Sequence, residues 1–240
     1  FISTFVSIFF LIPKLRNHGI VGYDMNKESK PEVVEMGGIG VIIGFSFGLI
    51  FLLLFAEISD IIGILVCFFV SLAIGTVGAY DDLFRLRQSV KAFIPFIIAI
   101  PTSLVISDEF DLPILGIINF GFLIYFLAPF GVTCGANASN MLEGFNGLGT
   151  GLLIIIAATQ SYLIIISESE PLGLVFTIPL LASLLAFLFF NFFPAKIFPG
   201  DTMLLFSGSL LVMIAYISNQ VVPTVFMMLF FVSEFFLKLR

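Results

Sequence analysis

The sequence is poor in charge, in cysteine and in histidine, and it contains no tryptophan. Only 11% of its 240 residues are charged, whereas soluble domains average roughly 25%. Two cysteines are too few for a disulfide-rich secreted scaffold, and neither Cys67 nor Cys134 has a histidine or cysteine neighbour with which to bind a metal. The phosphate loop G-x-x-x-x-G-K-S/T is absent as well, which argues against a nucleotide-hydrolysing pump.

What the chain has in excess is hydrophobic residues. They make up 60% of the sequence, and the mean hydropathy is +1.19. A chain this apolar cannot cover its surface with polar groups, so lipid must surround it. Nine apolar segments predict membrane helices, and we expect an all-α, polytopic transmembrane helical bundle. The segments lie near residues 1–13, 36–56, 61–79, 92–107, 114–134, 147–167, 171–190, 203–218 and 221–237.

The two ends of the sequence bear on the domain organisation. The first apolar segment has only 13 residues and no initiator Met, and the last segment runs directly into Lys238 and Arg240. We therefore expect residues 1–240 to be a single integral membrane domain that is truncated at both ends.

The basic residues test the number of segments, because successive connections alternate between the two sides of a membrane. All ten Lys and Arg fall in the connections after the first, third, fifth, seventh and ninth segments. The opposite connections carry only acidic or neutral residues. By the positive-inside rule, the basic side is cytoplasmic and the N-terminus lies outside. Because the basic residues are dispersed over five connections, we expect no nucleic-acid partner.

Two adjacent carboxylates, Asp81 and Asp82, follow the third apolar segment on the basic side. They repel each other and are costly to desolvate, so they indicate a bound cation, a proton-transfer role or basic neighbours. Arg85, Arg87 and Lys91 follow closely and suit anionic oxygens. An ordinary solvated loop at the membrane surface is the alternative.

A polar segment over residues 137–149 separates the fifth and sixth apolar segments. It contains three Asn, one Glu and three Gly. Amides and a carboxylate supply oxygen ligands and hydrogen-bond donors, and Gly permits close approach of the backbone to a ligand. Asn and Gly are also common in turns, but a turn needs fewer polar residues than this segment holds.

Asp201, in the sequence Phe-Pro-Gly-Asp-Thr before the eighth segment, is a third candidate. At a helix N-terminus it could serve only as an N-cap. It shares the basic side with Asp81, Asp82 and Asn140, however. Hard oxygen ligands beside Lys and Arg are what Mg²⁺ and a diphosphate require.

Together these clusters predict a cytoplasmic pocket of carboxylates and amides that can bind Mg²⁺ and is bordered by basic residues and lipid. Residues 22–27 and 35–38 of the first basic connection either join this pocket or form a mobile surface loop. Phosphoryl chemistry between a soluble nucleotide and a membrane lipid fits such a site. A transporter, the main alternative, would place ionisable residues inside the spans, whereas nearly all of them lie at the ends of the predicted helices.

The Asp-Asp connection ending in Lys91, the Asn-x-x-Asn-x-x-Glu-Gly-x-Asn-Gly segment and the Gly-Asp-Thr turn occur in the order and topology of a known family. In these motifs the whole chain resembles the polyprenyl-phosphate N-acetylhexosamine-1-phosphate transferases. It is most similar to the eukaryotic and archaeal UDP-GlcNAc–dolichyl-phosphate GlcNAc-1-phosphotransferases, because of its Gly-x-Asp-x-Asn-Lys opening. Glu143 and Asn146 also stand where the bacterial muramyl-pentapeptide enzymes have Asp. The resemblance implies ten spans, so one span and the basic connection before it would be missing.

The resemblance also implies a role for each residue of the reaction centre. Asp201 and Asn140 resemble the ligands of Mg²⁺, for which Mn²⁺ is a possible substitute. Lys91 resembles the lysine that contacts the diphosphate. Asp81 and Asp82 match the essential aspartate pair.

A second group of residues resembles the part of the family's site that binds uridine. Phe198 and Gly144 would lie on the two faces of the uracil. Asn146 and the backbone of Met25 would contact its edge, and Glu35 would hydrogen-bond the ribose.

The implied reaction transfers GlcNAc-1-phosphate, or a related HexNAc-1-phosphate, from a UDP-N-acetylhexosamine to dolichyl or another polyprenyl phosphate, and releases UMP. This is the first membrane step of lipid-linked oligosaccharide synthesis for N-glycosylation. We expect direct displacement at phosphorus, with a two-step route through a phospho-sugar on an aspartate as the alternative.

Two other functions stay open. One is a bacterial-type undecaprenyl-phosphate transferase for cell-wall or surface polysaccharide, and the other is an inactive homologue. A homodimer stays open as well. The membrane would be the cell membrane in an archaeon and the endoplasmic reticulum in a eukaryote.

Overall fold

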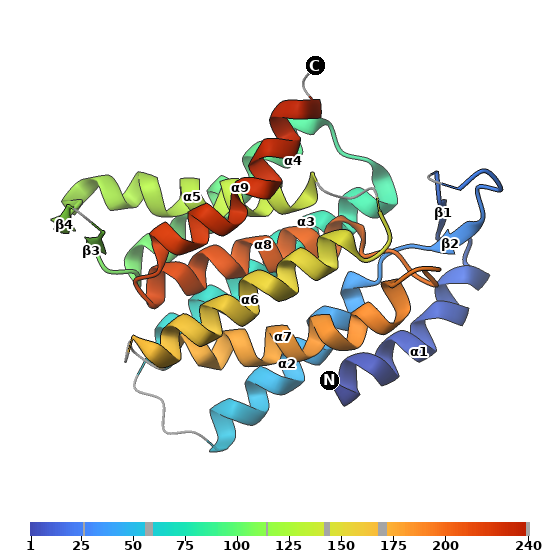
Figure 1. The fold of residues 1–240 in the computed structure, drawn as a ribbon, viewed down its shortest axis with the longest axis horizontal. Coiled ribbons are helices and arrows are strands. Elements are labelled where there is room, and N and C mark those ends of the chain that lie inside the picture. The colour runs from blue at the N-terminus through green and yellow to red at the C-terminus, as the bar shows by residue number, and fades with distance from the viewer. Residues whose placement is uncertain (26, 56–59, 114, 142–144, 168–171, 239–240) are drawn as a thin grey trace.

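The computed structural model describes all residues except 26, 56–59, 114, 142–144, 168–171 and 239–240 (Figure 1). In the described residues the chain forms nine α-helices, two short 3-10 helices and two β-hairpins. The α-helices are α1 (Ile2–Asn17), α2 (Gly38–Phe55), α3 (Ile61–Phe84), α4 (Gln88–Ala99), α5 (Ile124–Asn140), α6 (Leu148–Ile166), α7 (Leu172–Asn191), α8 (Gly200–Ile217) and α9 (Val221–Lys238). The 3-10 helices are η1 (Ile100–Leu104) and η2 (Gly121–Leu123), and the strands are β1 (Val21–Tyr23), β2 (Glu32–Val34), β3 (Glu109–Leu112) and β4 (Gly116–Asn119).

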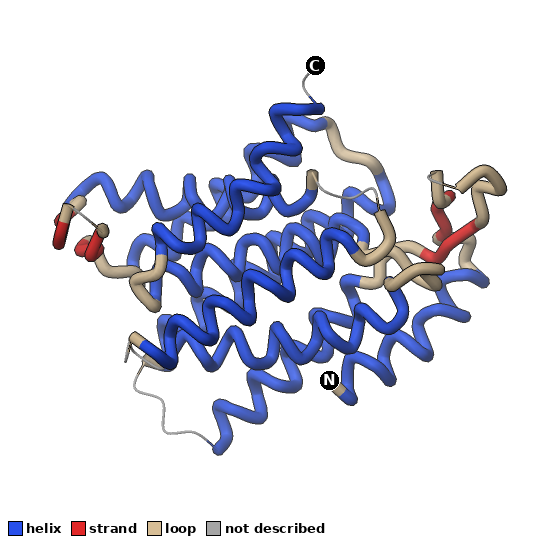
Figure 2. The backbone as a smooth tube through the Cα atoms, viewed as in Figure 1, coloured by secondary structure: helices blue, strands red, loops and turns tan. Residues whose placement is uncertain are grey.

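Helices account for nearly all of the regular structure, as the tube drawing shows (Figure 2). Each of the nine predicted apolar segments overlaps one α-helix. Among the described residues, six helices are long and apolar enough to cross a membrane: α2, α3, α5 together with η2, α6, α7 and α8. Two shorter apolar helices are formed by α4 with η1 and by the part Val221–Phe231 of α9. The predicted fold class, a multi-pass membrane bundle of helices, is therefore confirmed, while the count of nine spans and the outward N-terminus stay predictions.

Helix α8 lies at the centre of the bundle (Figure 1). It packs most extensively against α3 and α5 and also contacts α2, α6, α7 and α9. All of its residues from Gly200 to Leu211 are buried. Helix α3 approaches closely because Gly78 faces the backbone of Asp201, where any Cβ would collide with the Asp201 carbonyl. A helix buried on every side must have the N–H groups of its first turn satisfied within the protein.

The two hairpins are the elements that the sequence did not predict. Strands β1 and β2 pair antiparallel between α1 and α2, with Gly22 opposite Val33. This hairpin is tied to the segment before α8, because Phe198 N–H donates to the Val34 carbonyl at 2.7 Å and Gly37 N–H donates to the Phe198 carbonyl at 2.9 Å. The β1–β2 hairpin of the first connection therefore packs against this end of the bundle.

Several of the expected helix boundaries are wrong, among them the start of α5 and the end of α3. The segment expected over 114–134 begins as a strand, β4, which pairs with β3, and α5 starts only at Ile124. A short apolar run such as residues 115–118 cannot be assigned to a helix or a strand from its pattern alone, and Gly116, with φ of +73°, allows the tight turn. In addition, α3 continues five residues beyond 79, to Phe84, so Asp81 and Asp82 lie in its last turn and not in a loop.

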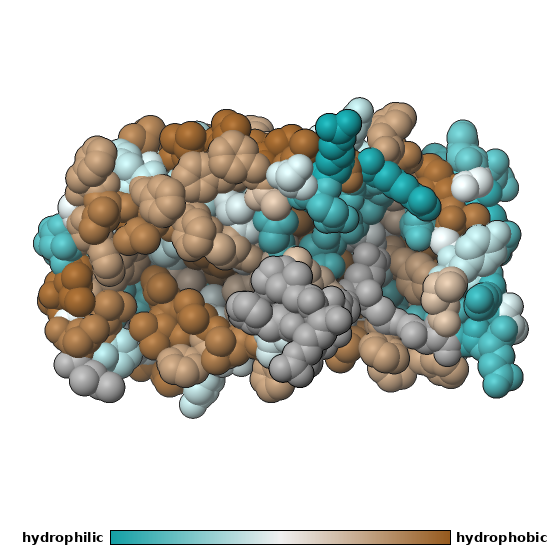
Figure 3. Space-filling model, turned by 90° about the horizontal axis from the view of Figure 1, so that it is seen from above, coloured by the Kyte–Doolittle hydropathy of each residue, from teal (hydrophilic) through white to brown (hydrophobic). Residues whose placement is uncertain are grey.

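The surface has a hydrophilic end and a largely hydrophobic remainder, as expected of a membrane protein. Seen from above, hydrophilic side chains gather toward the end of the molecule that carries β1 and β2, and hydrophobic side chains cover most of the rest of this face (Figure 3). Many large apolar side chains on the outside of the helices are exposed. In a bilayer such side chains face lipid, and the polar end faces water.

Candidate active site

Four helix ends meet at the end of the bundle that carries β1 and β2. The C-terminal turns of α3 and α5 contribute Asp81 and Asn140, and the N-terminal turns of α4 and α8 contribute Lys91 and Asp201. These four residues, which we call the lysine cluster, are spread over 120 positions of the sequence. They come together because successive helices alternate in direction, so that every second connection returns to the same end of the bundle.

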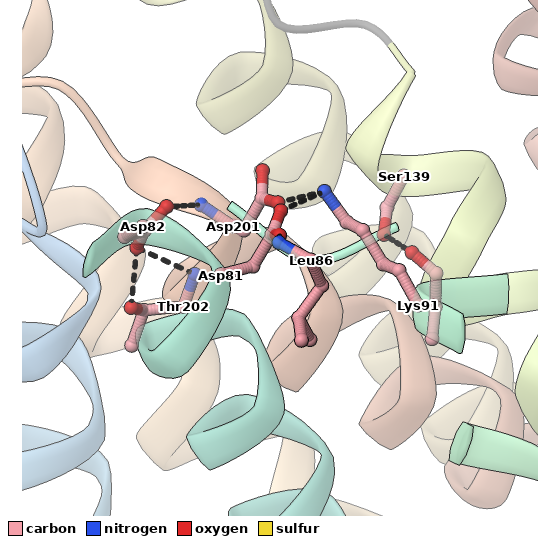
Figure 4. Close-up of polar contacts among 8 residues, drawn as sticks. Asp81, Asp82, Leu86, Lys91, Ser139, Asp201 and Thr202 are labelled. Atoms are coloured by element: carbon pink, nitrogen blue, oxygen red, sulfur yellow. Dashed lines mark hydrogen bonds and ion pairs between the residues drawn. The ribbon is translucent and has the colours of Figure 1, made fainter. Parts of the chain in front are cut away.

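Lys91 occupies the middle of the lysine cluster (Figure 4). Its ammonium donates to Asp81 Oδ2 at 2.8 Å and also pairs with Asp201 Oδ2. When the Asn140 amide is oriented to complement its neighbours, its oxygen accepts from Lys91 Nζ at 2.7 Å and its nitrogen donates to Asp201 Oδ1 at 2.6 Å. Lys91 is only 6% exposed, and a buried ammonium needs such partners to offset its desolvation. The predicted metal ligands, the predicted diphosphate lysine and Asp81 are thus adjacent.

Asp82 points the other way from Asp81 and caps α8 from outside the helix (Figure 4). Its carboxylate accepts from Asp201 N at 2.8 Å, from Thr202 N at 3.2 Å and from Thr202 Oγ1 at 2.6 Å. These bonds satisfy N–H groups that a buried helix start would otherwise leave unpaired, and a negative charge there complements the helix dipole. Gly200, with φ of +66°, leaves the space in which the Asp82 carboxylate lies. The N-cap role considered for Asp201 is therefore performed by Asp82, and the Asp201 carboxylate is directed to Lys91.

Lys91 is held in place through both of its neighbouring elements. Asp81 Oδ1 accepts from the backbone N–H of Leu86, in the connection that leads into α4. Asn137, on α5, donates through Nδ2 to the Ala92 carbonyl at 3.4 Å and to the Thr133 carbonyl at 2.9 Å. The first turn of α4 is thereby fixed against α5, which keeps the lysine within reach of the carboxylates.

A cavity of about 320 Å³ adjoins the lysine cluster, and we call it the main pocket. Asp82 and Gly200 line it, and Asp201 is the next residue after Gly200. Four of the residues predicted to bind uridine line it as well, whereas the fifth, Gly144, lies outside the described residues. The lining residues are Tyr23, Asp24, Met25, Glu35, Asp82, Phe145, Asn146, Gly149, Thr150, Asn191, Phe198, Pro199, Gly200 and Leu204.

Glu35 lies beside Asp82 in the main pocket, on the connection between β2 and α2. Its pKa is raised above 4.5, first because burial disfavours the ionised carboxyl and second because the Asp82 charge repels it, while Arg85 acts in the opposite direction. A raised pKa means that the folded protein binds this proton more tightly than the unfolded chain does. The stabilisation that Glu35 contributes is present in acid and is lost as the pH rises through its folded pKa.

We therefore expect Glu35→Gln to unfold at a higher temperature than the unsubstituted protein at pH 7, with the difference disappearing near pH 4. Thermal unfolding in detergent at several pH values measures this. The same variant should bind a UDP-sugar more weakly, since an amide offers one acceptor oxygen where the predicted ribose contact uses a carboxylate. If the two proteins differed in unfolding temperature by the same amount at every pH, the ionised form of Glu35 would not be the cause of the difference.

Three buried polar residues of the main pocket, Asp24, Thr150 and Asn191, were not among the predicted site residues. Asp24 is 3% exposed and lies in the first connection. Asn191 ends α7 and joins three segments: its Oδ1 accepts from Gly147 N at 3.2 Å and from Thr150 Oγ1 at 2.8 Å, and its Nδ2 donates to the Ile197 carbonyl at 3.0 Å. The sequence shows that Asn191 is a polar residue at the end of an apolar run. It does not show which groups Asn191 bonds to.

We expect Asn191→Leu to destabilise the protein by about 2–4 kcal/mol, because three buried polar groups lose their hydrogen-bond partner at once. Thermal or denaturant unfolding in detergent provides the measurement. Ser161→Ala is the control, since the Ser161 hydroxyl donates only to the Ala157 carbonyl of its own helix and its loss should cost less than about 0.5 kcal/mol. Equal stability of the two variants would show that Asn191 does not hold these segments together.

The lysine cluster offers the oxygen donors that Mg²⁺ prefers. Asp81, Asp201 and Asn140 direct two carboxylates and one amide oxygen at the Lys91 ammonium. Among the described residues no three His, Cys, Asp or Glu side chains form a metal site by themselves. Mg²⁺ commonly binds one or two carboxylates and takes its other ligands from water and substrate phosphates. The donor set therefore fits Mg²⁺ when a diphosphate is also present.

Comparison with known proteins identifies the family. The family model described as glycosyl transferase family 4 matches residues 63–219, which run from the first turn of α3 to just beyond the end of α8 and include every residue of the lysine cluster. The chain belongs to glycosyl transferase family 4. This confirms the resemblance found in the sequence motifs, although the individual roles given to the site residues stay predictions.

Relatives of this chain come from archaea, a yeast and bacteria. A protein of Saccharolobus solfataricus, provisionally named UDP-N-acetylglucosamine–dolichyl-phosphate N-acetylglucosaminephosphotransferase, is 39% identical over 100% of this chain and 76% of its own length. The protein of that name in Schizosaccharomyces pombe is 26% identical over 93% of this chain and 60% of its own length. A Bacillus subtilis protein, described as a probable undecaprenyl-phosphate N-acetylglucosaminyl 1-phosphate transferase, is 32% identical over 79% of this chain and 53% of its own length.

Proposed function

We propose that this chain transfers N-acetylglucosamine-1-phosphate, or a related N-acetylhexosamine-1-phosphate, from a UDP-sugar to dolichyl or another polyprenyl phosphate, releasing UMP. The observation that carries the proposal is the position of the lysine cluster directly beside the main pocket. Asp82 and Gly200 border the pocket, and Asp201 and Asp81, their sequence neighbours, bind Lys91. A nucleotide in the pocket would thus place its diphosphate next to the cluster. The names of the archaeal and yeast relatives support the same donor and acceptor.

In the proposed reaction an oxygen of the lipid phosphate attacks the phosphorus attached to the sugar. The bond from that phosphorus to the oxygen bridging the two phosphates breaks, and UMP leaves with that oxygen. A lipid phosphate monoester is already largely ionised near neutral pH, since its second pKa is about 6. Little general-base help is therefore needed, and Asp81 would orient the acceptor or accept its remaining proton.

Lys91 would stabilise the charge that spreads over the phosphoryl oxygens as the bonds exchange. It already lies among oxygen atoms, so it can move from Asp81 and Asp201 to the oxygens of a diphosphate. Asp201 and Asn140 would hold Mg²⁺, which supplies charge neutralisation at the diphosphate when bound. Phe198 and the exposed Phe145, which both line the main pocket, offer aromatic faces for stacking a nucleobase.

A route through a phospho-sugar covalently bound to an aspartate is the mechanistic alternative. The geometry favours the direct route, because both oxygens of Asp82 accept hydrogen bonds from the first turn of α8 and Asp81 is engaged by Leu86 and Lys91. An aspartate committed in this way is a poor nucleophile. Recovery of a labelled sugar-phosphate adduct on either aspartate after quenching would replace the direct route by the two-step one.

We further propose that the end of the bundle with the lysine cluster faces the cytoplasm. The basic residues of the connections at this end, such as Lys27, Arg85 and Arg87, follow the positive-inside rule. UDP-sugars would then reach the main pocket from the cytoplasm and the lipid acceptor from the bilayer. The membrane would be the cell membrane of an archaeon or the endoplasmic reticulum of a eukaryote.

The test of the proposed function is a transfer assay with the full-length protein in detergent or proteoliposomes. Radiolabelled UDP-GlcNAc, dolichyl phosphate and Mg²⁺ should yield a labelled lipid and an equal amount of UMP. Replacing dolichyl phosphate by undecaprenyl phosphate tests the bacterial-type alternative. Label that crosses the vesicle membrane without entering a lipid would contradict the proposal and support a transporter.

A further inference from the structure

Asp24 is a buried carboxylate that links two distant parts of the main pocket. It lies just after β1, is 3% exposed and lines the pocket. Its Oδ2 accepts from Asn146 Nδ2 at 3.1 Å across a separation of 122 residues. The same oxygen is 3.0 Å from the Lys27 ammonium, which in turn lies 4.7 Å from the centroid of the Phe193 ring. The carboxylate is therefore held both by the first connection and by the segment before α6.

The contact with Asp24 determines how the amide of Asn146 is oriented. An ionised carboxylate can only accept hydrogen bonds, so the amide nitrogen of Asn146, and not its oxygen, must face Asp24. Reversing the amide would bring its oxygen against the carboxylate, where two acceptors repel each other. Asn146 Oδ1 accepts no hydrogen bond from the part of the chain that the structure describes, and Asn146 lines the main pocket. The residue therefore offers a hydrogen-bond acceptor of fixed position to a ligand.

We infer that Asp24 is a positioning residue that makes the main pocket selective for uridine over cytidine, an inference that rests on the proposed function. Uracil presents an N–H donor at N3, whereas cytosine presents a bare acceptor nitrogen at the same position. A fixed Asn146 oxygen pairs with the first and repels the second. An amide that was free to rotate by 180° would fit either base, because its nitrogen could then donate to cytosine. Asp24 prevents this rotation without touching the base itself.

The ratio of two affinities distinguishes this inference from a purely structural role of Asp24. If Asp24 only held the first connection in place, Asp24→Ala would weaken UDP and CDP binding alike. If it orients Asn146, the same variant should lower the preference for UDP over CDP by about tenfold or more, the usual effect of one misplaced hydrogen bond in a buried site. The reason is that position 24 then offers no acceptor to the Asn146 amide nitrogen, so the amide can reverse and donate to cytosine.

The double variant Asp24→Ala with Asn146→Asp provides a rescue. The new carboxylate at position 146 has only acceptor oxygens, so an acceptor faces the base in either orientation. Asn146→Asp alone should lose affinity for both nucleotides, because it places two carboxylates within hydrogen-bond distance. The preference for UDP should therefore return in the double variant and be reduced in Asp24→Ala alone.

The experiment measures dissociation constants of UDP and CDP for the full-length protein in detergent, with Glu28→Ala as the matched control. Glu28 is an exposed acid in the same connection, so removal of its side chain should leave the ratio unaltered. An unchanged ratio in Asp24→Ala, or no recovery in the double variant, would overturn the inference.

A measurement without substitutions tests the acceptor role directly. The unsubstituted protein should bind the diphosphate of 3-methyluridine, which lacks the N3 hydrogen, at least about tenfold more weakly than UDP. Equal affinity would overturn the inference even if Asp24→Ala did not fold. Absence of UDP binding by the unsubstituted protein would contradict the proposed function itself, whereas selective UDP binding with an unchanged ratio in Asp24→Ala would contradict only the role of Asp24.

Discussion

Asp201→Ala is expected to reduce Mg²⁺-dependent transfer of the sugar-phosphate by at least about 10²–10³-fold while leaving the bundle folded. The large effect on activity follows because the carboxylate contacts both Lys91 and Asn140, and the loss of one preorganised charge-stabilising group at a reaction centre has effects of this size. The small effect on folding follows because the Asp201 side chain does not cap α8. Initial transfer rates over a range of Mg²⁺ concentrations, together with thermal unfolding, measure both expectations.

The matched comparison is Asp82→Asn, which, like Asp201→Ala, removes one negative charge from this end of the bundle. Asp82 accepts three hydrogen bonds from the start of α8, so weakening this cap should cost about 1–2 kcal/mol of stability. Asp201→Ala should thus lower activity more than stability, and Asp82→Asn should show a clear loss of stability. Near-normal transfer by Asp201→Ala would mean that this carboxylate has no part in the reaction.

Lys91→Met is expected to have the second largest effect, a loss of about 10²-fold or more in kcat with the folded structure retained. Methionine matches the length of the aliphatic stem, so the packing of α4 against α5 is preserved. It removes the only charge that faces both Asp81 and Asp201 among the described residues. Charge that develops on the phosphoryl oxygens would then lack a partner in a site where water is scarce.

Lys91→Arg and Arg87→Met provide the controls for this expectation. Arginine keeps the charge but is too large and planar for a position that is 6% exposed, so Lys91→Arg should be little more active than Lys91→Met. Arg87 is an exposed residue of the same connection, and its removal should reduce transfer far less than that of Lys91. If both Met variants reduced kcat equally, the effect would come from the general basic character of the connection and not from the lysine cluster.

Sequence patterns predicted the helices well because the physical signal is strong. Each span must satisfy its backbone hydrogen bonds internally and present apolar side chains to lipid, and both demands leave long apolar runs in the sequence. The convergence of Asp81, Asn140 and Asp201 was also predictable, because helices of alternating direction bring every second connection to the same end. The division of the basic residues between connections carries this information in the sequence itself.

The interactions inside the site could not be predicted, because they join residues far apart in the sequence. Nothing local in the sequence distinguishes Asp81, which binds Lys91, from Asp82, which caps α8. The two side chains point in different directions because α3 extends to Phe84 and successive residues of a helix are rotated by about 100°. Asp24 belongs to the Gly-x-Asp-x-Asn-Lys motif, yet its contact with Asn146 depends on how the first connection folds over the pocket.

Binding of Mn²⁺ tests the central claim, that the lysine cluster holds a divalent cation against the diphosphate of a nucleotide. Electron paramagnetic resonance can count the Mn²⁺ ions bound by the full-length protein with and without UDP. One Mn²⁺ per chain that requires UDP for tight binding, and that is lost in Asp201→Ala, is the predicted result. Mn²⁺ bound equally by Asp201→Ala and the unsubstituted protein would contradict the account.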